Sequence, residues 1–254
     1  MSATYRVGMI VPSSNTTMET ELPAVLRARE RERPQETFTL HSARVRMKHV
    51  TAEELRAMNA QTERAVAELA DMRPNVVATA CLVAVMTQGP NHPQVVQGEI
   101  ESTLDRQHAP APAVSSAGAL VDALHALGAR RIGMVAPYVK ELTHLVAGYI
   151  EDAGIAVADA VSLEVSDNRA VAALEPDDLR DHWRRLDLRD CDALVLSACV
   201  QMRSLPVLEE VERESELPTL SAATATAWAI LRALDLEPVA PGAGALLRSA
   251  ARVA

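Results

Sequence analysis

The chain has 254 residues, of which 48% are hydrophobic and only 2% are aromatic. Its formal net charge of −9 argues against a nucleic-acid partner, which would require a basic face. No apolar run reaches the roughly 18 residues of a membrane span, so no membrane contact is expected. With so few aromatic side chains the core must consist of Ala, Val and Leu, as in helices packed on a buried parallel sheet.

Strand and helix patterns alternate along the whole chain. Short apolar runs rich in β-branched residues predict strands at 5–11, 37–45, 75–80, 112–114, 131–136, 192–198 and 218–220, with 37–45 nearer an edge. Stretches rich in Ala, Leu and Glu predict helices at 17–31, 52–71, 92–106, 117–128, 140–153, 177–187, 205–215 and 222–234. This order predicts an α/β fold in which right-handed crossovers place helices on both faces of mainly parallel sheets.

Two pairs of similar segments suggest an internal duplication. "RVGMIVP" at 6–12 resembles "RIGMVAP" at 131–137, and "ATAC" at 78–81 resembles "LSAC" at 196–199. Any two strands rich in Ala and Val look alike, but two pairs in the same order favour duplication. We therefore expect two Rossmann-like lobes related by a pseudo-twofold axis, with the site between them. The expected lobes are residues 1–117 and 118–234, with 235–254 packing back on the first.

The three cysteines, Cys81, Cys191 and Cys199, have no disulfide-framework spacing. Together with an N-terminal stretch that lacks a signal-peptide pattern, this predicts reduced thiols in the cytoplasm. No Cys/His spacing resembles a zinc site, so no metal is expected. Cys191 precedes its strand and is interpreted as structural.

Cys81 and Cys199 both follow the ends of predicted strands, where parallel α/β sheets bind their ligands. In two duplicated lobes these thiols would face each other across a cleft. A thiolate is a strong nucleophile and a thiol can deliver a proton, so such a pair can act from both sides of a substrate. Inert packing, the usual role of a buried cysteine, is the alternative.

The segment "PSSNTTMETE" at 12–21 offers hydroxyl and amide donors at the start of a predicted helix. One interpretation is a carboxylate site built from these donors and the N–H groups of the helix start. The other is a well-capped helix without a ligand. The number of consecutive polar donors exceeds what one cap needs, which favours the anion site.

Several motifs occur together in one order: "VPSSNTTMETE", "ACLVAVM" around Cys81, "SSAGAL" at 115, "APY" at 136, "SACVQM" around Cys199 and "PGAGALL" at 241. As a set they resemble the maleate cis–trans isomerases, members of the aspartate/glutamate racemase superfamily of two-lobed, cofactor-free enzymes. The resemblance covers nearly the whole chain. It implies that maleate, a small dicarboxylate, is converted to fumarate through a succinyl-cysteine intermediate. It also implies a homodimer, the absence of a cofactor, and a role in nicotinate breakdown.

The resemblance also implies individual roles. Cys81 would be the nucleophile and Cys199 its acid/base partner. The substrate carboxylates would contact the side chains of Asn15, Tyr138 and Asn168 and the main chain at Leu82, Val83 and Val200. For addition Cys81 must be ionised, so we expect the N–H groups after its strand to lower its pKa.

The roles of two residues, Arg203 and His92, and three alternative functions stay open. Arg203 stands where the family commonly has Pro, so its charge either acts on Cys199 or points to solvent. His92 is interpreted as structural. An amino-acid racemase would also use two thiols, but it must bind an ammonium group, and "SSNTT" offers no acidic partner beside it. An arylmalonate decarboxylase keeps only one of the two cysteines. A non-catalytic two-lobed anion-binding protein would not need paired thiols.

Overall fold

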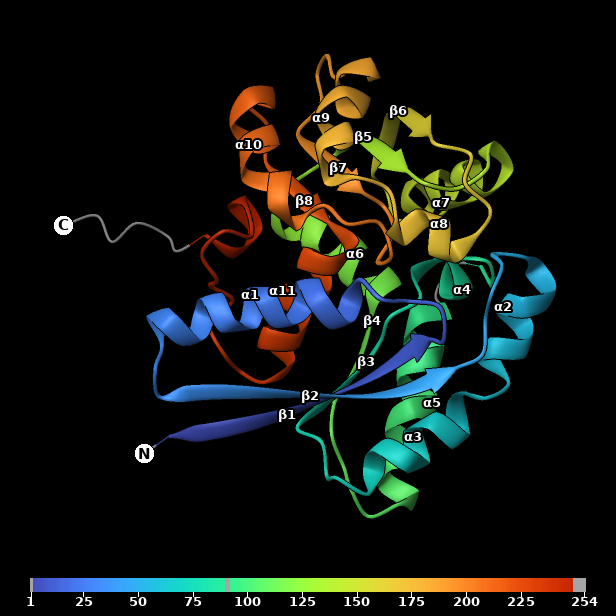
Figure 1. Cartoon of the computed structure of the whole chain (residues 1–254), viewed down its shortest axis with the longest axis vertical. Helices are drawn as coiled ribbons and strands as arrows, with labels where there is room; N and C mark the ends of the chain where they lie inside the picture. Colours follow the sequence, from blue (N-terminus) through green and yellow to red (C-terminus); the bar gives the residue numbers. More distant parts are fainter. Residues whose placement is uncertain (1, 90–91, 249–254) are drawn as a thin grey trace.

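Two parallel sheets of four strands each form the centres of the two halves of the chain (Figure 1). This computed structural model describes residues 2–89 and 92–248. The first sheet consists of β1 (Ala3–Pro12), β2 (Glu36–Val45), β3 (Val76–Thr79) and β4 (Ala113–Ser115). The second consists of β5 (Arg131–Ala136), β6 (Ala156–Ser162), β7 (Ala193–Ser197) and β8 (Thr219–Ser221). All paired strands run parallel, as the sequence predicts.

Helices and short helical turns connect these strands. The helices of the first half are α1 (Met18–Glu32), α2 (Ala52–Asn59), α3 (Thr62–Ala70), α4 (Leu82–Met86), α5 (His92–Arg106) and α6 (Ser116–Ala126). Those of the second half are α7 (Lys140–Asp152), α8 (Asn168–Ala172), α9 (Leu179–His182), α10 (Leu205–Ser215) and α11 (Ala222–Ala233). The 3₁₀ turns are η1 (Pro176–Asp178), η2 (Trp183–Arg185) and η3 (Ala245–Leu247). Every helix among the described residues is too short or too polar to cross a lipid bilayer.

The two sheets repeat one strand order, β2-β1-β3-β4 in the first and β6-β5-β7-β8 in the second. The repeated segments of the sequence fall on equivalent strands: "RVGMIVP" on β1 and "RIGMVAP" on β5, "ATAC" at the end of β3 and "LSAC" at the end of β7. The shared topology supports the duplication. It also places Cys81 and Cys199 after equivalent strands, each the third in its sheet.

Helix α11 connects the two halves. It follows β8 of the second sheet, yet it packs against α1, α6 and the strands β3 and β4 of the first (Figure 1). Its buried face is made mostly of Ala and Thr, with Trp228, Ile230 and Leu231 as the large apolar residues. Small side chains allow this close packing. The lobe boundary at residue 117 stays a prediction.

Several short or edge elements differ from the sequence prediction. Strand β6 was not predicted, because as an edge strand with mostly half-buried residues it lacks a continuous apolar run. The predicted helix 52–71 divides into α2 and α3, and 177–187 becomes η1, α9 and η2. Helices α4 and α8, five residues each, are too short for a periodic pattern. The edge position expected for 37–45 is confirmed by β2.

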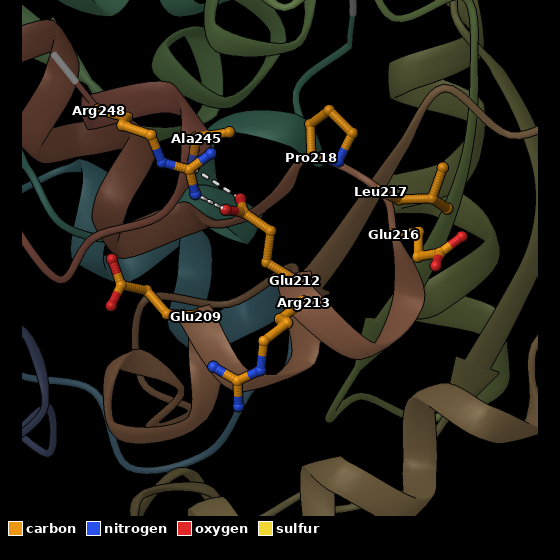
Figure 2. A pocket seen from close by; sticks show the side chains of 8 residues that line it. All are labelled: Glu209, Glu212, Arg213, Glu216, Leu217, Pro218, Ala245 and Arg248. Atoms are coloured by element: carbon orange, nitrogen blue, oxygen red, sulfur yellow. Dashed lines mark hydrogen bonds and ion pairs between the residues drawn. The ribbon is translucent and has the colours of Figure 1, made fainter. Parts of the chain in front are cut away.

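The described part of the C-terminal segment contacts both halves. On one side, the guanidinium of Arg29 in α1, which is 2% exposed, donates to the main-chain oxygens of Glu237 and Val239. On the other, Glu212 in α10 accepts hydrogen bonds from the main-chain N–H of Ala245 at 2.7 Å and from Arg248 (Figure 2). These buried charges hold the segment in place, while its assignment to the first lobe stays a prediction.

Gly244 packs closely against the second half. Its φ is +81°, and a Cβ there would lie 2.5 Å from Leu208 Cδ2 and 2.7 Å from the main-chain oxygen of Thr219. Gly244→Ala should therefore lower the free energy of unfolding by about 2 kcal/mol, measured by urea denaturation. Gly148→Ala in α7 is the control, because a Cβ there meets nothing within 4 Å. Equal stability of Gly244→Ala and the wild type would contradict the close contact.

Candidate active site

Cys81 lies between the end of β3 and the start of α4, and it is 5% exposed. The main-chain N–H of Ala84 donates a hydrogen bond to its sulfur. Burial nevertheless raises the pKa of the Cys81 thiol to about 12, because a thiolate removed from water loses more than one hydrogen bond restores. The expected lowering of this pKa is therefore wrong for the substrate-free site.

Cys199 follows the end of β7 by two residues and is 4% exposed. Burial also raises the pKa of its thiol, but three hydrogen bonds to the sulfur oppose this effect. They come from the hydroxyl of Tyr138 and from the main-chain N–H groups of Gln201 and Met202, with 3.3 Å between the Gln201 nitrogen and Sγ. The loop itself is held by the Ser197 hydroxyl, which donates to the main-chain oxygens of Cys199 and Met202.

Tyr138 connects the two thiols electrostatically. It lies two residues beyond β5, is 3% exposed, and donates its hydroxyl to the Cys199 sulfur. Burial raises the pKa of Tyr138 well above its usual value, and the charges of Cys199 and Cys81 raise it further. The charge of Cys199 also raises the pKa of Cys81. Three residues singled out from the sequence therefore share one buried site.

Asn15 serves both as a helix cap and as a contact between the lobes. It is 1% exposed, and its Oδ1 accepts hydrogen bonds from the N–H groups of Thr17 and Met18, each at 3.0 Å. Its Nδ2 points to the Cys199 loop and lies 3.4 Å from the main-chain oxygen of Val200. The oxygen is thus used by the helix start, and the NH₂ group faces the loop of the second cysteine.

Asn168 reaches the same region from the second half. It is the first residue of α8 and is 4% exposed. Its Nδ2 donates to the hydroxyl of Ser14 at 2.8 Å, and its main-chain oxygen accepts from Nε2 of Gln201 at 2.9 Å. The structure thus brings Asn168 against the loop that carries Asn15.

The main-chain positions named from the sequence also lie at the cysteines. Leu82 and Val83 are the first residues of α4 and are 1% and 3% exposed. N–H groups in the first turn of a helix have no acceptor within that helix. Val200 is 4% exposed and directly follows Cys199. All eight site residues predicted from the sequence therefore lie at the carboxyl ends of the strands.

A cavity of about 90 Å³ adjoins Cys81. Its lining includes the apolar side chains of Ile10, Met58, Val85 and Val96, and also His92. The buried hydroxyl of Thr79, another lining residue, has no hydrogen-bond partner among the described residues. The volume is enough for a few water molecules beside the sulfur. The interpretation of His92 as structural stays a prediction.

Sequence reasoning missed Gln201. Its side chain is 2% exposed and hydrogen-bonds to Ser14, Thr16 and Asn168. Its only signal in the sequence is its place two residues after Cys199, because burial of an amide cannot be read from composition.

Arg203, the position that departs from the family, is exposed, and its charge acts on the carboxyl of Glu21. Cys191 is buried at the start of β7, at the other end of that strand from Cys199.

Comparisons with known proteins agree with this geometry. A maleate isomerase from Geobacillus stearothermophilus is 49% identical over 247 residues, which is 97% of this chain and 98% of that protein. The solved structure of a cysteine-to-alanine variant of the maleate isomerase Iso from Pseudomonas putida S16 with maleate has a TM-score of 0.96 at 49% identity. It covers 98% of this chain and 99% of that one.

A third relative carries a trapped intermediate. The structure of a cysteine-to-serine variant of the Nocardia farcinica maleate cis–trans isomerase with a covalently bound succinylcysteine intermediate has a TM-score of 0.93 at 47% identity. It covers 97% of this chain and 99% of that one. The family model described as arylmalonate decarboxylase matches residues 7–247. This chain belongs to the maleate isomerase family, within the wider group that the arylmalonate decarboxylase family model describes.

Proposed function

We propose that the chain isomerises maleate to fumarate, with Cys81 as the nucleophile and Cys199 as the acid/base. The observation that carries this proposal is the pair of buried thiols after equivalent strands, both in electrostatic contact with Tyr138. Membership of the maleate isomerase family supports it. The reaction needs a nucleophile that adds reversibly and a proton donor beside it, and two thiols supply both.

The steps conserve atoms and electrons. The Cys81 thiolate adds to one alkene carbon, and the electron pair of the double bond moves onto the carboxylate of the other carbon as an enediolate. The Cys199 thiol gives its proton to that other carbon, which forms a succinyl thioether with a single bond between the two carbons. After rotation by about half a turn, Cys199 takes a proton back. The electron pair re-forms the double bond, and the Cys81 thiolate leaves from fumarate.

Carboxylate recognition is assigned to the polar groups around the thiols. The side chains of Asn15, Asn168 and Tyr138 and the N–H groups at Leu82, Val83 and Val200 would hold the two carboxylates and stabilise the enediolate. Well-placed donors of this kind each contribute a few kcal/mol to transition-state stabilisation. The burial of these groups supports the exclusion of water while the adduct exists.

The pKa values add one requirement. With the pKa of Cys81 raised to about 12 by burial, the thiol is neutral in the substrate-free site at pH 7. Cys81 must therefore lose a proton before or during addition. At Cys199 three hydrogen bonds to the sulfur oppose the effect of burial on the pKa, whereas at Cys81 one main-chain N–H does so.

Asn15→Ala should lower kcat/KM for maleate at least tenfold, about 1.4 kcal/mol of transition-state binding. The change removes the NH₂ group that faces the Cys199 loop and also the oxygen that caps α1. Asn15→Asp is the second variant, because it keeps the capping oxygen and replaces the NH₂ donor with a negatively charged carboxylate oxygen, so the loss for the dianionic substrate should be at least as large. Steady-state rates measure the effect. An unchanged kcat/KM in both variants would limit Asn15 to capping.

The function is tested by incubating the purified chain with maleate, without added metal or coenzyme, and following fumarate by proton NMR. Iodoacetamide-treated protein is the control, because alkylated thiols can neither add nor transfer protons. Racemisation of aspartate with unchanged maleate would favour a racemase. Binding of maleate without turnover would favour an anion-binding protein. A homodimer and a role in nicotinate breakdown are proposed on the family resemblance, and a cytoplasmic location on the pattern of the three cysteines. Light scattering tests the dimer.

A further inference from the structure

Gln201 lies where the two halves meet, and its side-chain amide makes three hydrogen bonds to the first half and one within the second half. Oε1 accepts from the N–H groups of Thr16 at 3.0 Å and Thr17 at 3.4 Å. Nε2 donates to the main-chain oxygens of Ser14 at 2.8 Å and Asn168 at 2.9 Å. Two acceptor sites and two donor hydrogens are the full capacity of an amide, so every polar position of this buried side chain is occupied.

These partners all lie on the segments that carry the proposed carboxylate contacts. Ser14, Thr16 and Thr17 surround Asn15, whose own Oδ1 shares the N–H of Thr17 with Gln201. Asn168 is held twice, through its main-chain oxygen by Gln201 and through its side chain by Ser14. One amide therefore hydrogen-bonds to the main chain on both sides of Asn15 and to the main chain of Asn168.

The main chain of Gln201 connects the same residue to the thiol. Its N–H donates to the Cys199 sulfur at 3.3 Å, and its carbonyl oxygen accepts from the hydroxyl of Thr17 at 2.6 Å. The direction of that N–H depends on the orientation of the peptide, which the anchored side chain fixes. A hydrogen bond to the sulfur favours the thiolate over the thiol.

We propose that Gln201 is a positioning residue that joins the carboxylate contacts of both halves to the orientation of Cys199. Binding of the dicarboxylate and proton transfer by Cys199 then both depend on the hydrogen bonds that Gln201 makes. Only an amide suits the place, since a carboxylate cannot donate to the oxygens of Ser14 and Asn168 and an apolar side chain would leave buried polar groups unpaired. The inference rests on the proposed function for its kinetic consequence, but not for its effect on the thiol.

The first test is Gln201→Glu, which has nearly the same shape but places an oxygen against two carbonyl oxygens. We expect kcat/KM for maleate to fall at least tenfold, with a rise in KM. In the substrate-free protein, the pH profile of Cys199 alkylation by iodoacetamide should shift to higher pH, read by peptide mass spectrometry. Gln97→Glu is the matched control, because Gln97 donates to the main-chain oxygen of Ala113 away from the thiols. It should leave both measurements unchanged.

Thr17→Val separates geometry from charge and serves if Gln201→Glu does not fold. It keeps the shape of the side chain and removes only the hydroxyl that donates to the Gln201 carbonyl. The alkylation profile of Cys199 should shift in the same direction, and a double-mutant cycle with Asn15→Ala should be non-additive. An unchanged profile in Thr17→Val, or additive effects in the cycle, would overturn the proposal. Because alkylation needs no turnover, an inactive wild type would refute the function without deciding this inference.

Discussion

Replacing Cys81 with serine should lower kcat/KM for maleate by at least about a thousandfold, roughly 4 kcal/mol of transition-state stabilisation. Serine can keep the hydrogen bond from the N–H of Ala84. Its hydroxyl is not ionised near neutral pH, so no nucleophile forms and no thioether can result. Initial rates of fumarate formation measure the loss. Mass spectrometry of the protein with maleate should find no succinyl adduct on this variant.

Cys191→Ser is the matched control for this variant. Cys191 is also a buried thiol, but it precedes β7 instead of following it. Its replacement should leave kcat/KM within about a factor of two, provided that the protein remains folded. If Cys81→Ser retained more than a tenth of wild-type activity, the assignment of Cys81 as nucleophile would be wrong.

Cys199→Ser should retain the ability to form the adduct but lose turnover by roughly ten- to a thousandfold. A hydroxyl can occupy the place of the thiol and receive the hydrogen bonds from Tyr138 and the loop N–H groups. It exchanges protons far less readily, so the step that removes a proton from the adduct should become slow. Intact-mass spectra with maleate should then show one added maleate mass on this variant.

Peptide mapping decides between the two thiols. The added mass should lie on the peptide that contains Cys81. The reverse pattern, with an adduct on Cys81→Ser and none on Cys199→Ser, would exchange the roles of the two residues. The paired site would survive that result, because both thiols would still contact the substrate.

The positions of the two cysteines could be predicted from the sequence because strand ends are local features. An apolar run that ends in Ala-Cys marks the carboxyl end of a buried strand, and its recurrence in both halves indicates equivalent strands. The topology then places each thiol after the third strand of its sheet, β3 or β7. The roles of individual residues came from the family resemblance, because a strand end carries no information on which thiol adds first.

The pKa of Cys81 and the role of Gln201 could not be predicted in the same way. The sequence shows N–H groups after the strand, but the depth of burial that outweighs them depends on how both halves pack. Gln201 acts through main-chain groups of segments far away in the sequence, and main-chain partners leave no trace in residue identity. Strand β6 was missed for a related reason, since a half-buried edge strand needs no strongly apolar pattern.

The most direct test of the covalent mechanism is to quench the wild-type protein during turnover of maleate. Samples taken over time are acidified, and fumarate is measured by proton NMR while the digested protein is analysed by mass spectrometry. We predict that fumarate accumulates without any added coenzyme and that the peptide containing Cys81 carries one maleate mass during turnover. Unchanged maleate, or fumarate formed while an adduct occurs only on Cys199, would contradict the mechanism proposed for this chain.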